Sequence, residues 1–357
     1  MSGIFTHIIV TCLIFGGIAL FGLLAVYAER KIAGFVQDRL GPMETGPYGL
    51  LQTVADILKL IQKEYIAPDK ADKVLFKIAP IVIFIAVFMG LSVIPWGPGI
   101  DFANTHTGLF LLMVIVSIDV LGILMAGWSS NNKYSLLGAM RSIAQMISYE
   151  IPVGLSLLAV VSLHQTLNLQ TLTLQQGILS NTSVFFMGFW DVSDIGGIFA
   201  WNIFQAPHLI AIYGLFFIST LAECNRAPFD IPEAESELIG GFHTEYSGVR
   251  FAFIFLGEYA MMFLVAILGA VLFLGGWNTP LPNIGPLQLA SWTTGYFWGV
   301  AWLLLKSLLV VGIQIWVRWT LPRFRADQLM NLCWKVFIPV GFIGLGISAI
   351  WRIFVMI

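Results

Sequence analysis

The chain has 357 residues, of which 58% are hydrophobic and 11% are charged, and its mean hydropathy is +0.87. A soluble domain carries about 25% charged residues, so this composition excludes a soluble protein and indicates a polytopic membrane protein. The net charge of −2 argues against a nucleic-acid partner. The three cysteines (Cys12, Cys224 and Cys333) are far apart, so no iron–sulfur, zinc or other metal site is expected.

Eight apolar runs are long enough to cross a bilayer, because a spanning helix needs about 20 mostly apolar residues. We predict spans at 5–28, 78–97, 108–128, 143–163, 199–222, 251–276, 293–317 and 334–355. The expected fold is an all-α polytopic membrane protein with about eight transmembrane helices, forming a single integral membrane domain over residues 1–357. An interfacial amphipathic helix and short helices in the cytoplasmic loops are also expected.

The distribution of basic residues predicts the orientation. Every Lys and Arg outside the predicted spans lies in a connection that follows an odd-numbered span. Cytoplasmic loops carry the excess of Lys and Arg, so we expect these connections inside the cell and both termini on the periplasmic side of the inner membrane.

The first inner connection, 27–68, contains an amphipathic pattern. Apolar residues recur at helical spacing on one face (Leu50, Leu51, Val54, Leu58, Ile61 and Tyr65), and polar residues on another (Gln52, Asp56, Lys59 and Lys63). A helix of this kind is too polar to span and lies along the interface. It is either a plain anchor or one wall of a cavity that opens to lipid.

The first span ends in Glu29, Arg30 and Lys31. The two basic residues satisfy the positive-inside rule without any further role. A lone carboxylate at a helix end gains little, so Glu29 is a candidate for pairing with a basic group or for proton transfer.

The next inner segment, 127–152, leads into the fourth span. Arg141, Gln145 and Ser148 share one helical face. Glu150 lies just inside the span, and Pro152 loosens the backbone hydrogen bonding of the turn before it. Glu150 is therefore either a wet, functional carboxylate or half of an Arg–Glu pair between neighbouring helices.

The segment 221–241 is rich in carboxylates and lies between two long apolar runs. It contains Arg226 and five carboxylates, Glu223, Asp230, Glu233, Glu235 and Glu237. The Asp-Ile-Pro-Glu sequence at 230–233 predicts a helix start, which places Glu233 and Glu237 on one face. Carboxylates this crowded beside apolar runs suit a proton relay, and the alternative is a solvated acidic loop.

Asp119, Glu258 and Lys306 also fall within predicted spans. Each needs a partner or water in an apolar medium, and together with Glu150 and Glu223 they are candidates to line a buried polar path. The basic residues of 316–335 suit a juxtamembrane anchor, and the outer segment 164–198 has no assigned role.

Four long motifs carry a family resemblance: YAERKIAGFVQDRLGP, ADILKLIQKE, GWSSNNKYSLLGAMRSIAQMISYEIP and LAECNRAPFDIPEAESELIGGFHTEYSG. The chain resembles the H subunit of bacterial NADH–quinone oxidoreductase, the family of mitochondrial NADH dehydrogenase subunit 1 in respiratory complex I. The resemblance implies a proton-pumping complex, with a quinone chamber formed together with subunits of the hydrophilic arm. Small membrane subunits are further implied partners.

The resemblance also implies roles for individual residues. Quinone would bind near Glu29, Arg30, Lys59 and Lys63. The acidic path would run through Glu150, Glu223, Glu233, Glu235 and Glu237, with Arg226 as a pairing partner. No cofactor is expected on this chain, whereas FMN and iron–sulfur clusters are expected in partner subunits. The alternatives are the related membrane subunit of an energy-converting hydrogenase, a stand-alone ion transporter and a passive anchor.

Overall fold

The computed structural model describes residues 2–100, 102–103, 105–178, 180, 184–185, 190–231, 240–284 and 287–355. Within these residues, seven helices are long and apolar enough to cross a membrane. They are α1 (Ser2–Val36), α3 (Lys73–Val93), α4 (Gly108–Ser129), α5 (Lys133–His164), α10 (Gly248–Phe273), α12 (Tyr296–Thr320) and a continuous stretch of α13 (Ala326–Leu332), a π-helical turn (Cys333–Phe337) and α14 (Ile338–Val355). The predicted all-α polytopic membrane fold is confirmed.

The fifth predicted span, 199–222, begins later than the sequence indicated. Its first part forms two short turns, η2 (Gly197–Ala200) and α7 (Asn202–Gln205), and the long helix α8 covers only His208–Glu223. The break falls at Ala206, which is extended because the residue before a proline is pushed out of the helical region. At a rise of 1.5 Å per residue, α8 is about 24 Å long, shorter than the roughly 30 Å hydrocarbon core.

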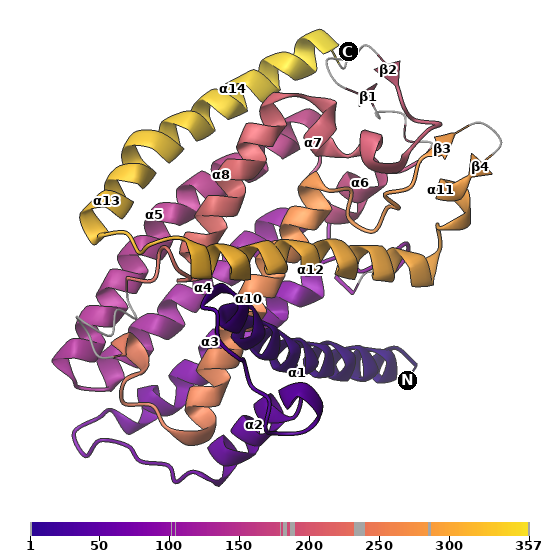
Figure 1. Cartoon of the computed structure of the whole chain (residues 1–357). Coiled ribbons are helices and arrows are strands. Elements are labelled where there is room, and N and C mark those ends of the chain that lie inside the picture. Colours follow the sequence, from indigo (N-terminus) through magenta and orange to yellow (C-terminus); the bar gives the residue numbers. More distant parts are fainter. Residues whose placement is uncertain are drawn as a thin grey trace.

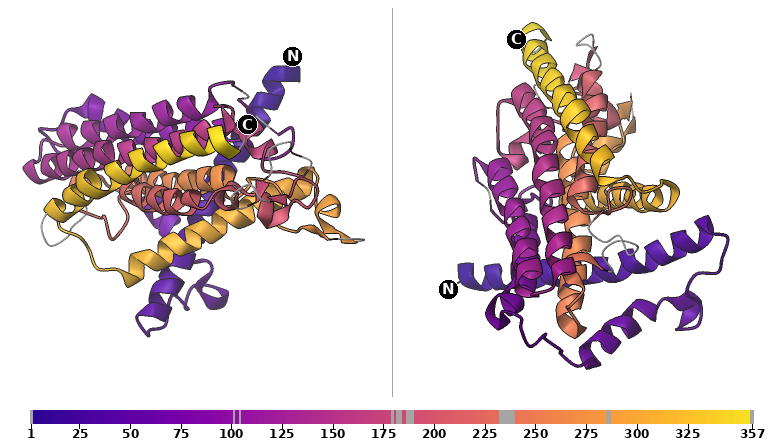
Figure 2. Two further views of the ribbon diagram at one scale, coloured as in Figure 1. Left: turned by 90° about the horizontal axis from the view of Figure 1, so that it is seen from above. Right: turned by 90° about the vertical axis from the view of Figure 1, so that its left-hand side faces the viewer.

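Helix α10 forms the centre of the molecule. Every residue from Tyr259 to Phe273 is buried, as expected for a helix that is apolar on all sides. Helices α3, α4, α5, α8 and α14 run alongside one another, whereas α1 and α12 cross α10 steeply (Figure 1). The second panel of Figure 2 shows α1 lying across the other helices.

The amphipathic helix predicted in the first inner connection is present as α2 (Gln52–Gln62). It follows a short turn, η1 (Pro47–Gly49), in which Gly49 has a φ of 77° and packs so closely on Pro42 that a Cβ would lie 2.2 Å from its carbonyl oxygen. Leu50, Leu58 and Ile61 are all about half exposed, so the apolar face of α2 is open to lipid or to a partner. A further short turn, η3 (Gly241–His243), lies beyond the acidic segment.

The opposite end of the molecule from α2 is built from short elements. Two small antiparallel hairpins pair there: β1 (Val184–Phe185) with β2 (Trp190–Asp191), and β3 (Asn283–Ile284) with β4 (Leu287–Gln288). In the first, Val184 faces Asp191, and in the second, Asn283 faces Gln288. Helices α6 (Leu169–Leu174) and α11 (Leu289–Trp292) accompany them. We call this side the far end, and the side with Glu29 the site end.

At the far end, side chains cap the buried C-terminus of α10. Gln176 donates to the carbonyl of Val271 (2.9 Å), Asn202 to that of Leu272 (2.6 Å), and Lys306 to that of Leu274 (2.7 Å). The last carbonyls of a helix have no partner within it, so these donors satisfy acceptors that would otherwise be buried unpaired. The segment 164–198, which had no assigned role, therefore supplies part of this cap.

Lys306 was expected on a polar path with Glu150 and Glu223, and the structure contradicts that expectation. Its ammonium also donates to the carbonyls of Gly276 (2.9 Å) and Asn278 (2.6 Å) and lies over the ring of Trp201. All three of its N–H donors are thus used at the far end. Sequence position alone indicated that Lys306 lies in a span, but it did not indicate at which depth or against which neighbour.

Candidate functional site

The site is organised by the loop that follows α8. Gln145 on α5 donates to the carbonyls of Ala222 and Phe229, each at 2.7 Å, and so closes the loop across its base. Asn225, with a φ of 50°, donates to the hydroxyl of Ser142 (2.9 Å). Gln145, from the predicted polar face of α5, and Ser142 therefore hold this loop in place, and the loop directs Arg226 into the protein.

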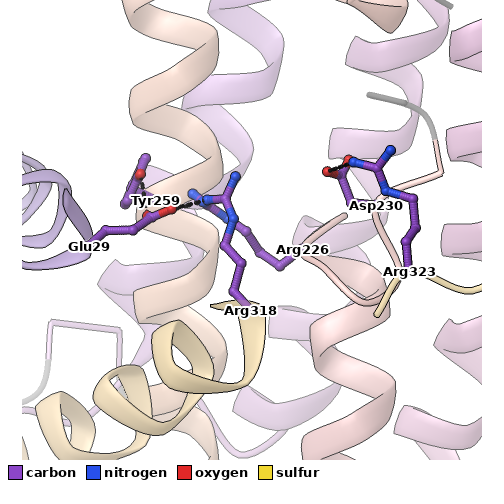
Figure 3. A network of polar contacts seen from close by, with 6 residues as sticks. All are labelled: Glu29, Arg226, Asp230, Tyr259, Arg318 and Arg323. Atoms are coloured by element: carbon purple, nitrogen blue, oxygen red, sulfur yellow. Dashed lines mark hydrogen bonds and ion pairs between the residues drawn. The ribbon is translucent and has the colours of Figure 1, made fainter. Parts of the chain in front are cut away.

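Arg226 belongs to a buried charge cluster centred on Glu29. The Glu29 carboxylate accepts hydrogen bonds from Tyr259 (2.5 Å), from Arg226 (3.4 Å) and from Arg318. Figure 3 shows Arg226 and Arg318 pointing toward this carboxylate. The four residues come from α1, the loop after α8, α10 and α12, so one carboxylate joins four parts of the chain. We call this group the Glu29 cluster.

Burial makes the Glu29 cluster energetically significant. The side chains of Glu29 and Arg226 are 7% and 6% exposed. Charges removed from water are tolerated only when they are paired, and removing one partner of a buried pair typically costs about 3–5 kcal/mol. Burial alone would lower the pKa of Arg226, but Tyr259 and Glu29 outweigh it, so the pKa stays above its ordinary value and the guanidinium keeps its charge. The guanidinium also lies 4.1 Å from the centroid of the Tyr259 ring.

Two buried carboxylates and a partly buried one lie beside the Glu29 cluster. Glu223 ends α8, and it is within electrostatic range of Glu150 on α5 and Asp119 on α4. Glu150 accepts a hydrogen bond from Ser117, and Glu223 and Asp119 are 5% and 7% exposed. We call Asp119, Glu150 and Glu223 the acidic group. Since Arg226 follows Glu223 by three residues, the loop joins this group to the Glu29 cluster.

The surroundings of Cys224 show that charged groups from several helices meet at this loop. Burial raises the pKa of its thiol well above the ordinary range, and Glu223 acts in the same direction. Asp119, Glu258 and Arg226 also act on it electrostatically. The thiol is therefore protonated and serves as an apolar spacer in the charged loop. Among the described residues, no group of three His, Cys, Asp or Glu side chains is arranged to hold a metal ion.

The basic residues expected near quinone lie at the surface of the site end. Arg30 forms an ion pair with Asp56 on α2 (2.6 Å), and Lys59 approaches the same carboxylate at 3.8 Å. Lys63 is exposed at the end of α2. Neighbours in sequence thus diverge in space, because Glu29 turns into the protein and Arg30 turns toward α2.

A further ion pair at this end links the loop to the segment after α12. Arg323 donates to the carboxylate of Asp230 at 3.0 Å, and the backbone N–H of Phe324 donates to the carbonyl of Pro228. The sequence suggested that Arg318 and Arg323 serve as juxtamembrane anchors, but both bind carboxylates of the site instead. The helix predicted to begin after Asp230, and with it the carboxylates Glu233, Glu235 and Glu237, falls in 232–239, outside the described residues.

Sequence reasoning identified Glu29 and Arg226 but missed Tyr259, Arg318 and Ser117. A tyrosine in an apolar run and an arginine at a helix end carry no local signal of function. Their contacts with Glu29 span 230 and 289 residues of chain, so only the tertiary fold shows them.

These features define a multi-pass membrane protein with buried, interacting ionisable groups at one end of its bundle. The model of the family described as NADH dehydrogenase matches residues 8–349. The chain is 54% identical to the second NADH-quinone oxidoreductase H subunit of Cytophaga hutchinsonii, covering 95% of this chain and 97% of that protein. It is 51% identical to the H subunit of Chlorobium luteolum (95% and 87% covered) and 42% identical to that of Bacteroides thetaiotaomicron (93% and 87%). The chain belongs to the family of NADH-quinone oxidoreductase H subunits, and it is a subunit of that enzyme complex.

Proposed function

We propose that this chain helps form the quinone-binding chamber of the complex and couples quinone reduction to proton translocation. The names of its relatives give NADH and quinone as the reactants of the enzymes to which they belong. The chain contributes no redox centre in this proposal. Electrons reach the quinone from partner subunits of the hydrophilic arm, which carry FMN and iron–sulfur clusters.

The quinone part of the proposal is supported by the surface at the site end. The exposed apolar face of α2 suits a hydrophobic tail that enters from lipid. Arg30, Lys59 and Lys63 line the adjacent surface with hydrogen-bond donors that suit quinone oxygens. Glu29 is adjacent to Arg30 in the sequence but turns inward, so it connects this surface to the protein interior.

The proton part rests on one observation: Glu29 and Arg226 are in contact, and Arg226 is joined by the loop to the acidic group. A proton that reaches Glu29 neutralises the carboxylate that balances Arg226. The unbalanced guanidinium then favours the ionised form of Glu223 and so favours release of a proton toward Glu150. Glu233, Glu235 and Glu237 extend the proposed path.

The proposal places the site end on the cytoplasmic face of the inner membrane, with both termini on the periplasmic side. Its support is the positive-inside rule, since Arg30, Arg226, Arg250, Arg318 and Arg323 belong to connections or helix ends on one side of the chain's topology. The other subunits of the complex, quinone and lipid are the proposed partners.

The test uses Glu150→Gln and Glu223→Gln in the intact complex, because an amide keeps the size of the side chain but carries no exchangeable acid proton. We expect assembly to persist, while coupled quinone reductase activity and proton pumping in proteoliposomes both fall. Asp194→Asn is the matched control, since this carboxylate is exposed at the far end. Unchanged pumping in both variants would favour the passive-anchor alternative.

A further inference from the structure

An apolar cavity of about 400 Å³ lies between α1, α3, α10 and α12, on the far-end side of the Glu29 cluster. Among the described residues, those lining it carry no charged side chain, and nearly all of its lining is carbon. Its floor includes Phe21 and Phe263, whose rings stack with centroids 4.3 Å apart. A quinone headgroup would find no charged donors along these walls, which separates this cavity from the proposed quinone surface.

The cavity is long enough to hold one extended acyl chain. It follows α1 from Leu13 to Leu24, which is about 16 Å at 1.5 Å per residue. The hydrocarbon core of a membrane is roughly 30 Å thick, so one leaflet contributes about 15 Å. An extended acyl chain of one leaflet therefore fits along the cavity.

One edge of the cavity is exposed on the outer surface of the bundle, and its far-end side lies near exposed aromatic residues. Leu13 and Leu24 on α1 and Leu308 on α12 line it and are each more than half exposed, so they form an edge toward lipid. Val300 lines its far-end side, one turn from Tyr296 and Phe297, which are 69% and 79% exposed. Exposed aromatic residues at helix ends mark the headgroup level of a membrane.

We propose that this cavity is a binding site for one acyl chain of a phospholipid in the far-end leaflet. The chain lies against Phe21, Phe263 and Leu304, and the headgroup lies at the level of Tyr296. Binding there fills space between α1 and α12, two helices that both contribute to the Glu29 cluster.

Two neighbouring glycines of α1 provide a matched pair of variants. A Cβ at either Gly16 or Gly17 meets nothing within 4 Å, so a side chain can start from both positions without a clash. Gly17 lines the cavity and Gly16 does not. Gly17→Phe therefore fills the cavity with a ring, whereas Gly16→Phe places the same ring outside it.

The experiment uses the intact complex reconstituted with a phosphatidylethanolamine that carries a diazirine in one acyl chain. After irradiation, label is mapped on the peptide containing Phe263, which is only 5% exposed and which bulk lipid does not reach. We expect label at Phe263 in the wild type and in Gly16→Phe. In Gly17→Phe we expect about tenfold less, since displacing two methylene groups is enough for that change. If Gly17→Phe fails to assemble, Gly17→Leu replaces it as the variant that fills the cavity.

Three results would overturn the proposal. Equal labelling of Phe263 in wild type and Gly17→Phe would show that the label arrives by another route. Labelling by a quinone with a diazirine in its tail, without labelling by the phospholipid, would assign the cavity to quinone. No lipid label, with a cross-link from Gly17→Cys to another subunit, would show that a partner helix occupies it.

Discussion

The contacts of Glu29 explain why a carboxylate is stable in the interior of this membrane protein. The Glu29 carboxylate accepts hydrogen bonds from the phenol of Tyr259 and from the guanidiniums of Arg226 and Arg318. Arg226, in contrast, has to share this carboxylate with Arg318. The two partners of this ion pair are therefore not equivalent. Loss of the carboxylate leaves two cations facing each other, while loss of Arg226 leaves Glu29 with two donors.

This asymmetry predicts different stabilities for two amide variants. Glu29→Gln is expected to cost about 3–5 kcal/mol, because it leaves buried cations uncompensated. Arg226→Gln is expected to cost about 1.5–3 kcal/mol, the usual range for one lost hydrogen bond to a charged group. The thermal midpoint of the intact complex, measured for both variants, should fall further for Glu29→Gln. Equal shifts, or a larger one for Arg226→Gln, would disprove this description of the cluster.

The elements differ in how far the sequence predicted them. The spacing of the apolar residues was sufficient to predict α2, because the residues that form the apolar face of an amphipathic helix lie close together in the sequence. The start of α8 was missed, because a run of apolar residues hides the effect of Pro207 on Ala206. The capped end of α10 could not be foreseen, because its donors come from α7, α12 and the turn after α6.

The cap at the far end predicts that Lys306 stabilises the fold and takes no part in proton transfer. Lys306→Met leaves three carbonyls without their donor, at about 1–3 kcal/mol for each unsatisfied group. The thermal midpoint of the complex should fall by many degrees, with the KM for quinone unchanged in complex that survives. Lys73→Met, at an exposed position, should change neither quantity. An unchanged thermal midpoint together with reduced proton pumping would instead indicate that Lys306 belongs to the proton path.

At the scale of the whole molecule, buried charged residues lie in two groups, one at the far end and one at the site end. The far end uses Lys306 and amide side chains to close the bundle, and the site end gathers Glu29, Arg226 and the acidic group. The sequence predicted which carboxylates are unusual, because charge within apolar runs is rare. It did not predict which of them meet, because Glu29 and Arg226 are 197 residues apart.

The central claim is that Arg226 links the quinone surface to the acidic group, and binding of a quinone-site inhibitor to the intact complex tests it most directly. Linkage is reciprocal, so a change in the acidic group must alter affinity at the quinone surface if the two are coupled. We predict that Glu223→Gln changes the inhibitor Kd by about five-fold or more in the wild-type background, the lower end of typical coupling, and has little effect in the Arg226→Gln background. A Glu223→Gln effect of the same size in both backgrounds would contradict the claim.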